Sequence, residues 1–276
     1  MRVFVTGASG WIGSAVLPEL ISSGHQVVGL ARSDEPAANL AAAGVEVQRG
    51  SLDDLDSLSA AAAASEGVVH LAVKHDIAFA GDFQGAVDAD RRAIETLGGV
   101  LAGSDRPFLL ASGTLGLAPG RVATERDGQV SDPAAAPALG GAESRLATLV
   151  DIARAKGVSG YLGDGSSRWP AVHQLDAAQL FCLALEEAPA GTTLHAIADE
   201  GVAIRHIAEV IGGHLGVPVA AIPAAEAGEH FTWLAGFLGI DSPASSAPTH
   251  ELLGWQPTQA GLIDDLDQGH YFGSSD

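Results

Sequence analysis

Three glycines near the start of the chain, Gly7, Gly10 and Gly13, have the clearest chemical meaning, and they are spaced three residues apart. Between a strand and a helix, the first glycine would permit a tight turn and the second would let the backbone approach a pyrophosphate. The third would let the helix and the strand pack closely. The helix that follows would add unpaired amides and a positive dipole end. The spacing therefore predicts a dinucleotide-binding turn, with contacts from Gly7, Ser9, Gly10, Trp11, Ile12 and Gly13.

The elements that must position this turn alternate along the N-terminal half of the chain. Short apolar segments rich in β-branched residues predict strands at 2–6, 26–30, 45–47, 68–71 and 107–111. Apolar stripes at helical spacing predict helices at about 12–21, 36–43, 54–64 and 85–101. Repeated strand–helix units indicate an α/β fold, a doubly wound Rossmann-type parallel sheet with helices on both faces. We expect this domain to cover 1–115 and a loop, a returning helix and a small C-terminal substrate lobe to cover 116–276.

The end of the second strand bears on the choice of cofactor. NAD-preferring sites place Asp or Glu there to hold the ribose hydroxyls. Here the strand ends in Arg32 and Ser33, and no acid occurs until Asp34. A guanidinium presents a planar, bidentate cation to a phosphate, and the serine hydroxyl adds a donor. The sequence therefore predicts NADP as the preferred cofactor, with NAD as the alternative.

The glycine spacing resembles that of the extended and atypical short-chain dehydrogenase/reductase families, which include nucleotide-sugar epimerases and dehydratases. Three later segments agree with this resemblance: Gly50-Ser51-Leu52-Asp53-Asp54, His70-Leu71-Ala72 and Ala111-Ser112-Gly113-Thr114. The resemblance implies further cofactor contacts from Ser51, Leu52, Leu71 and Ala72. It also implies that Ser112 or Thr114 is catalytic. The segments 168–176 and 251–257 are similar to parts of the family's C-terminal substrate lobe, so the resemblance covers nearly the whole chain.

One departure from the family pattern concerns its catalytic pair. Catalytic members carry Tyr-x-x-x-Lys on a helix after the fifth strand, where one turn brings both side chains to one face. The tyrosines here are Tyr161 and Tyr271, the lysines are Lys74 and Lys156, and no pair of them has this spacing. The segment between the fifth strand and residue 168 is also shorter than the family pattern, and its Gly/Pro/Ala-rich part at 116–141 predicts an exposed loop.

Composition excludes several other classes of protein. With 14 basic and 34 acidic residues the net charge is −20, which disfavours binding to nucleic acid or to an anionic membrane surface. The single cysteine, Cys182, lies in an apolar segment and predicts a buried, unreactive thiol in a reducing compartment. No leader, membrane span or metal-ligand spacing is evident. We therefore expect a cytoplasmic protein with a small-molecule substrate and no metal, and the resemblance implies a homodimer.

Two functional hypotheses remain open at this stage. The first is an NAD(P)-dependent oxidoreductase that transfers a hydride to or from a small carbonyl or alcohol. The second is a catalytically silent NADP-binding protein that senses redox state or binds a partner, like the nitrogen-regulator branch of the atypical families. The missing tyrosine and lysine favour the second hypothesis. The preserved C-terminal segments favour the first.

Overall fold

The computed structural model describes residues 1–127 and 142–273, and these form two compact units. One unit comprises Met1–Gly113 and Gln174–Thr192, and the other comprises the remaining described residues from Thr114 onward. The segment Gln174–Thr192, which we assigned to the C-terminal part, thus belongs to the N-terminal unit. No helix in the described residues combines the length and the apolar character that crossing a membrane requires.

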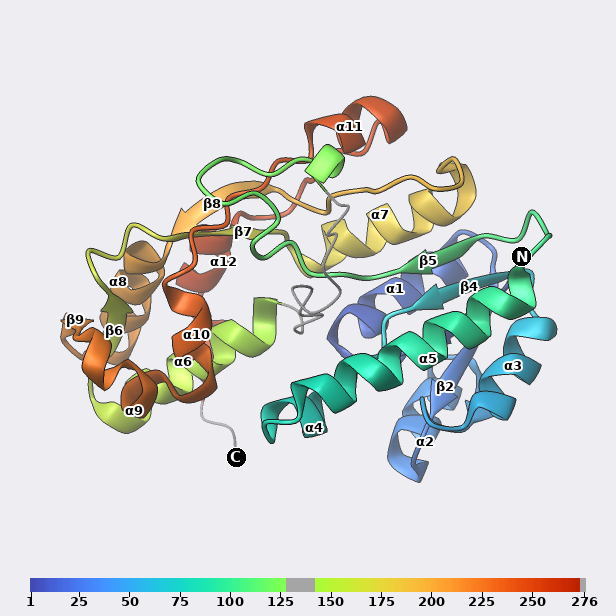
Figure 1. Cartoon of the computed structure of the whole chain (residues 1–276), viewed down its shortest axis with the longest axis horizontal. Coiled ribbons are helices and arrows are strands. Elements are labelled where there is room, and N and C mark those ends of the chain that lie inside the picture. Colours follow the sequence, from blue (N-terminus) through green and yellow to red (C-terminus); the bar gives the residue numbers. More distant parts are fainter. Residues whose placement is uncertain (128–141, 274–276) are drawn as a thin grey trace. The chain divides into compact units, whose positions relative to one another are not determined.

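The N-terminal unit is built on a sheet of five parallel strands in the order β3-β2-β1-β4-β5 (Figure 1). The strands are β1 (Arg2–Thr6), β2 (Gln26–Ala31), β3 (Glu46–Arg49), β4 (Gly67–His70) and β5 (Phe108–Leu110). The helices are α1 (Trp11–Ser22), α2 (Asp34–Ala42), α3 (Leu55–Ala63), α4 (His75–Phe79), α5 (Phe83–Leu101) and α7 (Gln174–Glu187). The doubly wound α/β fold expected from the sequence is confirmed.

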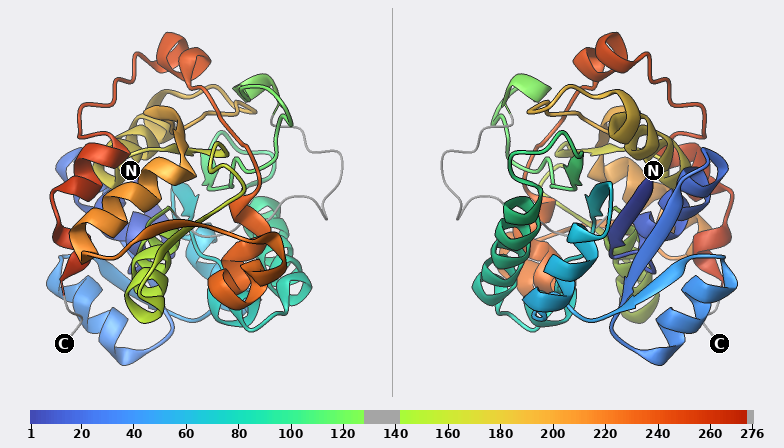
Figure 2. Two further views of the ribbon diagram at one scale, coloured as in Figure 1. Left: turned by 90° about the vertical axis from the view of Figure 1, so that its left-hand side faces the viewer. Right: turned by 90° about the vertical axis from the view of Figure 1, so that its right-hand side faces the viewer.

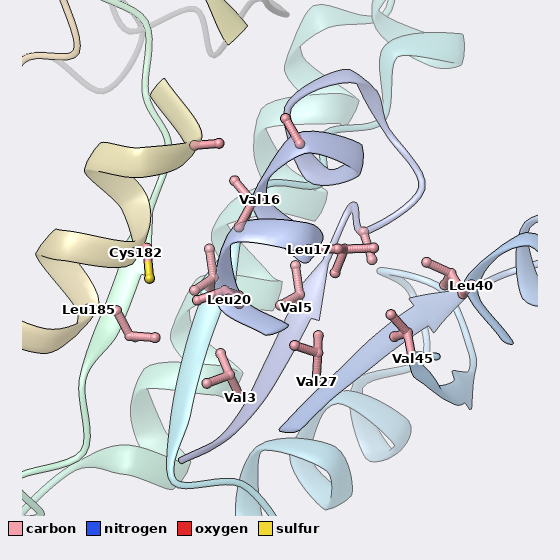
Figure 3. Close-up of a cluster of buried hydrophobic side chains, with 14 of the residues drawn as sticks. Val3, Val5, Val16, Leu17, Leu20, Val27, Leu40, Val45, Cys182 and Leu185 are labelled. Atoms are coloured by element: carbon pink, nitrogen blue, oxygen red, sulfur yellow. The ribbon is translucent and has the colours of Figure 1, made fainter. Parts of the chain in front are cut away.

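The side chains of β1 point alternately to the two faces of this sheet, and a separate hydrophobic core lies on each face. Val3 and Val5 face α1 and α7, in the cluster drawn in Figure 3. Phe4 faces the opposite side and packs with residues of α3 and α5. Because successive side chains of a strand point to opposite faces, one buried strand supports helices on both sides of the sheet. The right-hand view of Figure 2 shows the strands running between these helices.

The second unit contains two small sheets, one of β6 and β9 in parallel and one of β7 and β8 in antiparallel pairing. Its strands are β6 (Ser159–Leu162), β7 (Arg168–Ala171), β8 (Asp199–Ala203) and β9 (Val219–Ile222). Its helices are α6 (Ala142–Lys156), α8 (Ile204–Leu215), α9 (Ala227–Phe231), α10 (Ala235–Leu238), α11 (Ala247–Leu253) and α12 (Leu262–Asp267). Short 3-10 helices occupy Glu125–Asp127, Ala224–Glu226, Thr232–Leu234 and His270–Phe272.

Strand β6 does not join the large sheet and pairs with β9 instead. A side chain at Gly160 would lie 2.6 Å from an Ile222 atom and 2.9 Å from the Phe231 ring. The strand is therefore fitted to β9 and α9 of its own unit. The predicted loop at 116–141 is described only to residue 127, where it ends in a 3-10 helix. The rest of that loop lies outside the described residues.

Candidate functional site

The turn after β1 has the close contacts that its glycines were expected to permit. Gly7 has a φ of +68°, and its carbonyl accepts a 2.9 Å hydrogen bond from the Gly10 amide. A Cβ on Gly7 would lie 2.7 Å from the amide nitrogen of Ala72 and 2.8 Å from the carbonyl carbon of Leu71. The turn therefore lies directly against the chain that leaves β4. This contact places Leu71 and Ala72 beside the turn, where we predicted cofactor contacts.

Gly13 and Gly10 meet different surroundings. A Cβ on Gly13 would lie 2.1 Å from the Gly7 oxygen and 2.7 Å from the Ala8 oxygen, so this glycine sets the packing of α1 on the turn. A Cβ on Gly10 would meet only the Gly7 oxygen, at 3.1 Å. Gly10 is also the N-cap of α1, and none of the described side chains caps this helix. The backbone here is free to approach a phosphate group at the positive end of the helix.

Three other residues predicted in the turn have different exposures. Ser9 and Trp11 are exposed, and 42% of Trp11 is accessible to solvent. Ile12 is half-buried and packs on the core that α1 shares with α7. The side-chain amide of Gln174 donates to the Trp11 carbonyl, which ties the start of α7 to the start of α1. The exposed side chains therefore remain available to a ligand, whereas Ile12 supports the helix from below.

At the ends of β2 and β3 two arginines flank Ser33. Arg32 follows β2, and its guanidinium lies 3.1 Å from the Asp76 carboxylate with 70% of the side chain exposed. Arg49 ends β3; it donates to the Ser33 carbonyl and, at 2.6 Å, to the Asp34 carboxylate. The hydrogen bond from Arg32 holds the pKa of Asp76 below its ordinary value. Arg32 and Ser33, which we predicted to contact a 2′-phosphate, therefore lie at the same edge of the sheet as a second arginine, Arg49.

Sequence reasoning missed Arg49 because we considered only the end of the second strand. The signal was available: in a parallel sheet neighbouring strands end at the same edge, and Arg49 lies opposite Ala31 in the β2–β3 register. An arginine at the last position of the third strand could therefore have been assigned to the same edge as Arg32.

Ser51 and Leu52, two of the predicted cofactor contacts, follow β3. The Ser51 hydroxyl accepts a 3.3 Å hydrogen bond from the Asp53 amide. Leu52 is buried and belongs to the core under α3 and α5, so its side chain stabilises the loop from inside. Asp53 accepts a 2.8 Å hydrogen bond from the Lys74 ammonium, and this ion pair joins the segments that follow β3 and β4.

Beneath the turn a buried chain of polar side chains connects β1, β4 and α5. The Thr6 hydroxyl lies 2.8 Å from His70 Nδ1, and His70 Nε2 lies 3.0 Å from an Asp90 carboxylate oxygen. Thr6 also accepts a 3.3 Å hydrogen bond from the Ala72 amide. With Nε2 carrying the proton, the neutral His70 ring accepts from Thr6 and donates to Asp90, and every group is satisfied. Asp90 was not predicted, because its partner is 20 residues away on another element.

The two predicted catalytic residues belong to different units. Ser112 is exposed near the end of the N-terminal unit, and the amide of the preceding Ala111 donates a 3.1 Å hydrogen bond to the carbonyl of His70. Thr114 begins the other unit, where its carbonyl accepts a 3.2 Å hydrogen bond from the Ser242 hydroxyl. Ser112 is therefore joined to the edge that carries the glycine turn, whereas the backbone of Thr114 is held by the second unit.

In the second unit, Arg168 is paired within its own fold. Its guanidinium makes two hydrogen bonds to the Asp241 carboxylate, at 2.9 and 2.8 Å, and its amide donates a third at 2.9 Å. Its bidentate carboxylate partner gives it a structural role here.

Comparisons with known proteins agree with this geometry. The model of the "NAD dependent epimerase/dehydratase family" matches residues 3–88, which include the glycine turn, both arginines and the Asp53–Lys74 pair. An uncharacterized protein of Schizosaccharomyces pombe is 42% identical over 299 aligned positions, covering 99% of this chain and 100% of the relative. An uncharacterized protein of Saccharomyces cerevisiae is 43% identical over 294 positions, covering 96% of this chain and 98% of the relative.

Solved structures share the fold at low sequence identity. A dTDP-glucose 4,6-dehydratase from Streptomyces venezuelae with NAD bound has a TM-score of 0.73 at 18% identity and covers 97% of this chain and 95% of its own. A triphenylmethane reductase from Citrobacter sp. complexed with NADP(H) has a TM-score of 0.70 at 15% identity, covering 97% and 99%. Together with the glycine turn, the matching family model and the relatives aligned over nearly the whole chain show that the protein belongs to the NAD-dependent epimerase/dehydratase family.

Proposed function

We propose that the protein is an NADP(H)-dependent oxidoreductase that transfers a hydride to or from a small carbonyl or alcohol substrate. The observation that carries the cofactor part is the presence of two arginines at this edge of the sheet: Arg32, which precedes Ser33 and pairs with Asp76, and Arg49, whose guanidinium donates to the Ser33 carbonyl. A 2′-phosphate is a dianion with acceptor oxygens, and planar guanidiniums bind such groups through paired hydrogen bonds. NAD-preferring sites instead place a carboxylate at this position to hold the ribose hydroxyls.

Both arginines are paired with carboxylates in the structure. Because these pairs are exposed, a phosphate could replace the carboxylates with little loss of stability. Asp34 is fully exposed, and Asp76 has 53% of its side chain exposed. Ion pairs between exposed groups stabilise a protein by about 0–1 kcal/mol. A phosphate that binds both guanidiniums can therefore displace these carboxylates with little loss of folding free energy. This competition also supports specificity, because NADH offers no group that would displace them.

The residues present fit a dinucleotide. Gly10 leaves the backbone open at an uncapped helix N-terminus, which suits the pyrophosphate, and Ala72 lies against the turn where a nicotinamide ribose would extend. When bound, the cofactor would supply or accept the hydride. The Ser112 hydroxyl would donate a hydrogen bond to the substrate oxygen and stabilise the negative charge that develops on it.

The proton in this proposal comes from solvent, because no tyrosine in the sequence has a lysine four residues later. Two other groups near the end of β4 are poorly suited to the task. Lys74 is held in its ion pair with Asp53. Burial lowers the pKa of His75, so at neutral pH its imidazole is uncharged and a weak proton donor.

The absence of Tyr-x-x-x-Lys also favours a second function, a catalytically silent NADP-binding protein that reports redox state to a partner. It would use the same cofactor residues and would need no proton donor. The two functions differ in one measurable property, because only an oxidoreductase consumes NADPH when a carbonyl substrate is added.

The cofactor proposal is tested by titrating the protein with NADPH and NADH, followed by calorimetry. A hydrogen bond to a charged group contributes about 1.5–3 kcal/mol, so Arg32→Ala and Arg49→Ala should each weaken NADPH binding about 10–100-fold. Binding of NADH should change less than about threefold, since the lost contacts involve only the 2′-phosphate. Arg91→Ala is the matched control, because Arg91 is an exposed arginine paired with Asp88 on α5. Equal weakening of both cofactors would refute the assignment.

The catalytic part is tested with NADPH and a panel of small aldehydes, ketones and quinones. Turnover that falls in Ser112→Ala while NADPH affinity is unchanged would support the oxidoreductase. Tight NADPH binding without turnover on any member of the panel would favour the silent binding protein instead.

A further inference from the structure

A second cluster of reactive side chains lies at the opposite edge of the large sheet from the glycine turn. His25 immediately precedes β2, whereas the turn follows the end of β1, which runs parallel to β2. Cys182 and Glu186 come from α7, which packs beside α1, and Figure 3 shows the Cys182 sulfur on the side of α7 that faces α1. The two residues are four positions apart, so one helical turn places them on the same face.

These three side chains converge on one point. His25 Nε2 lies 2.9 Å from a Glu186 carboxylate oxygen, and the Cys182 thiol donates a 3.3 Å hydrogen bond to the Ser23 hydroxyl. One imidazole nitrogen, the thiol sulfur and one carboxylate oxygen all lie within 4.8 Å of one another. This is the only such group of three or more His, Cys, Asp or Glu side chains within the described part of the chain.

We propose that His25, Cys182 and Glu186 form a binding site for a zinc-class divalent transition-metal ion. Tetrahedral zinc, with bonds of about 2.0–2.3 Å to nitrogen, oxygen and sulfur, requires its ligand atoms to be about 3.3–3.6 Å apart. The donors need to move only by about 1 Å or less to reach that spacing. A thiolate is a soft ligand, and this set therefore selects zinc over magnesium or calcium, which take oxygen ligands.

The burial of the ligands supports a site that is largely preformed and open on one side. Only 6% of the His25 side chain and 4% of Cys182 are exposed, whereas 38% of the Glu186 side chain is exposed. Packing therefore fixes two ligands, and the third can adjust to the ion. The exposed side admits water as the fourth ligand, which completes a tetrahedral set.

Metal binding at this point would cross-link two distant parts of the N-terminal unit. His25 belongs to the turn between α1 and β2, and Glu186 lies 161 positions later near the end of α7. An ion bound by both segments stabilises the folded state by mass action, because the unfolded chain does not hold the ligands together. No metal-ligand spacing is evident in the sequence, because His25 and the two residues of α7 come from segments that only the fold brings together.

Cobalt(II) binding to the metal-free, full-length protein tests this proposal directly. Because Cys182 is the only cysteine, a thiolate-to-cobalt charge-transfer band in the near ultraviolet can arise only from this residue. We expect the band to saturate at one cobalt per chain and to disappear when zinc is added. Zinc should also raise the thermal midpoint of the wild-type protein but not that of Cys182→Ser.

Variants of the other two ligands complete the test. Since loss of a hydrogen-bond partner of a ligand alone weakens metal affinity about 10–100-fold, His25→Ala and Glu186→Gln should each weaken binding at least that much. Glu187→Gln is the matched control, because this neighbouring carboxylate is also exposed but is outside the cluster. Glu186 is exposed, so Glu186→Gln leaves the core intact. A folded wild-type protein without the band, or an affinity unchanged in both variants, would overturn the site.

Discussion

Replacing Gly13 by alanine is the sharpest perturbation of the dinucleotide turn. The new methyl group would lie 2.1 Å from the Gly7 oxygen and 2.7 Å from the Ala8 oxygen. Both atoms belong to the backbone, so no side chain can rotate away. To reach an ordinary contact of about 3.4 Å, the first turn of α1 must retreat from the Gly7 carbonyl by about 1 Å. That retreat also widens the site of phosphate binding.

The expected cost follows from two opposing terms. Overpacking typically destabilises a protein by about 1–3 kcal/mol, and the backbone contacts here favour the upper end. Alanine also stabilises a helix relative to glycine by about 1 kcal/mol. The net loss should therefore be about 2 kcal/mol, which lowers the thermal midpoint by about 4–8 °C for a domain of 150–250 residues. NADPH affinity should fall as well, because the helix end has moved.

Two other glycines separate steric strain from the general effect of adding a methyl group. Gly99 lies in α5 with nothing within 4 Å of the added atom, so Gly99→Ala should stabilise the protein by about 0.5–1 kcal/mol. Gly10→Ala meets one backbone oxygen at 3.1 Å and should leave stability within about 1 kcal/mol of wild type. Because its methyl group would occupy the proposed path of the pyrophosphate, Gly10→Ala should weaken NADPH binding more than about tenfold.

Urea unfolding followed by circular dichroism measures the stability terms, and calorimetry measures the binding term. The urea midpoints should rank Gly99→Ala above wild type and Gly13→Ala well below it. The midpoints can be ranked only if the variants share the same dependence of unfolding free energy on urea concentration. A changed dependence would indicate a change in the unfolded state or a loss of two-state behaviour. A Gly13→Ala protein with the wild-type midpoint and wild-type NADPH affinity would refute the packing argument.

Two further predictions concern the His70–Asp90 hydrogen bond and the Arg168–Asp241 ion pair, for which the geometry indicates whether a substitution lowers stability. Asp90→Ala should destabilise the protein by about 1–3 kcal/mol, because the His70 Nε2 proton loses its buried acceptor, whereas Asp90→Asn keeps an acceptor and should cost less; urea unfolding distinguishes the two. The hydrogen bond from Arg168 lowers the pKa of Asp241 below 3.8, so this pair stabilises the fold above pH 3.8 and loses its effect as the pH falls through the lowered value. The free energy of unfolding of the wild-type protein should therefore exceed that of Asp241→Asn by up to about 1 kcal/mol at pH 7, since the pair is partly exposed. This difference in unfolding free energy should shrink as the pH falls below 3.8. A difference that does not depend on pH would contradict the pairing.

The sequence predicted the parts of this protein that depend on local pattern. The strands at β1, β2 and β4 are short apolar runs, and their burial on both faces of a parallel sheet makes such runs recognisable. The turn could be predicted because its three glycines are adjacent in the sequence and each has a separate steric reason. Strand β6 and its pairing with β9 were not predicted, because the pairing depends on the packing of Gly160 against Ile222 and Phe231.

What the sequence could not predict is nonlocal. Arg49 reaches Ser33 only because β3 pairs beside β2, and the Asp90 carboxylate reaches His70 only because α5 lies over β4. The association of α7 with α1 requires a contact between segments more than 150 positions apart, such as the Gln174 side chain and the Trp11 carbonyl. The composition of the chain and the spacing of its motifs do not indicate which distant segments come into contact. They follow from topology, and for that reason side chains such as Arg49 were absent from the predicted site.

Cofactor binding and catalysis depend on different residues in the proposed function, so the two can be tested separately. The residues proposed to bind the cofactor, from the glycine turn to Arg32 and Arg49, all lie within the unit that contains the large sheet. Catalysis needs a proton source as well, and the chain has no Tyr-x-x-x-Lys pair to supply it. Cofactor affinity and turnover should therefore respond to different substitutions. A variant such as Arg49→Ala that loses NADPH affinity tests the first property, and Ser112→Ala tests the second. If both properties fell together in Ser112→Ala, the serine would be holding the cofactor edge rather than the substrate, and another group would have to stabilise the charge that develops on the substrate oxygen.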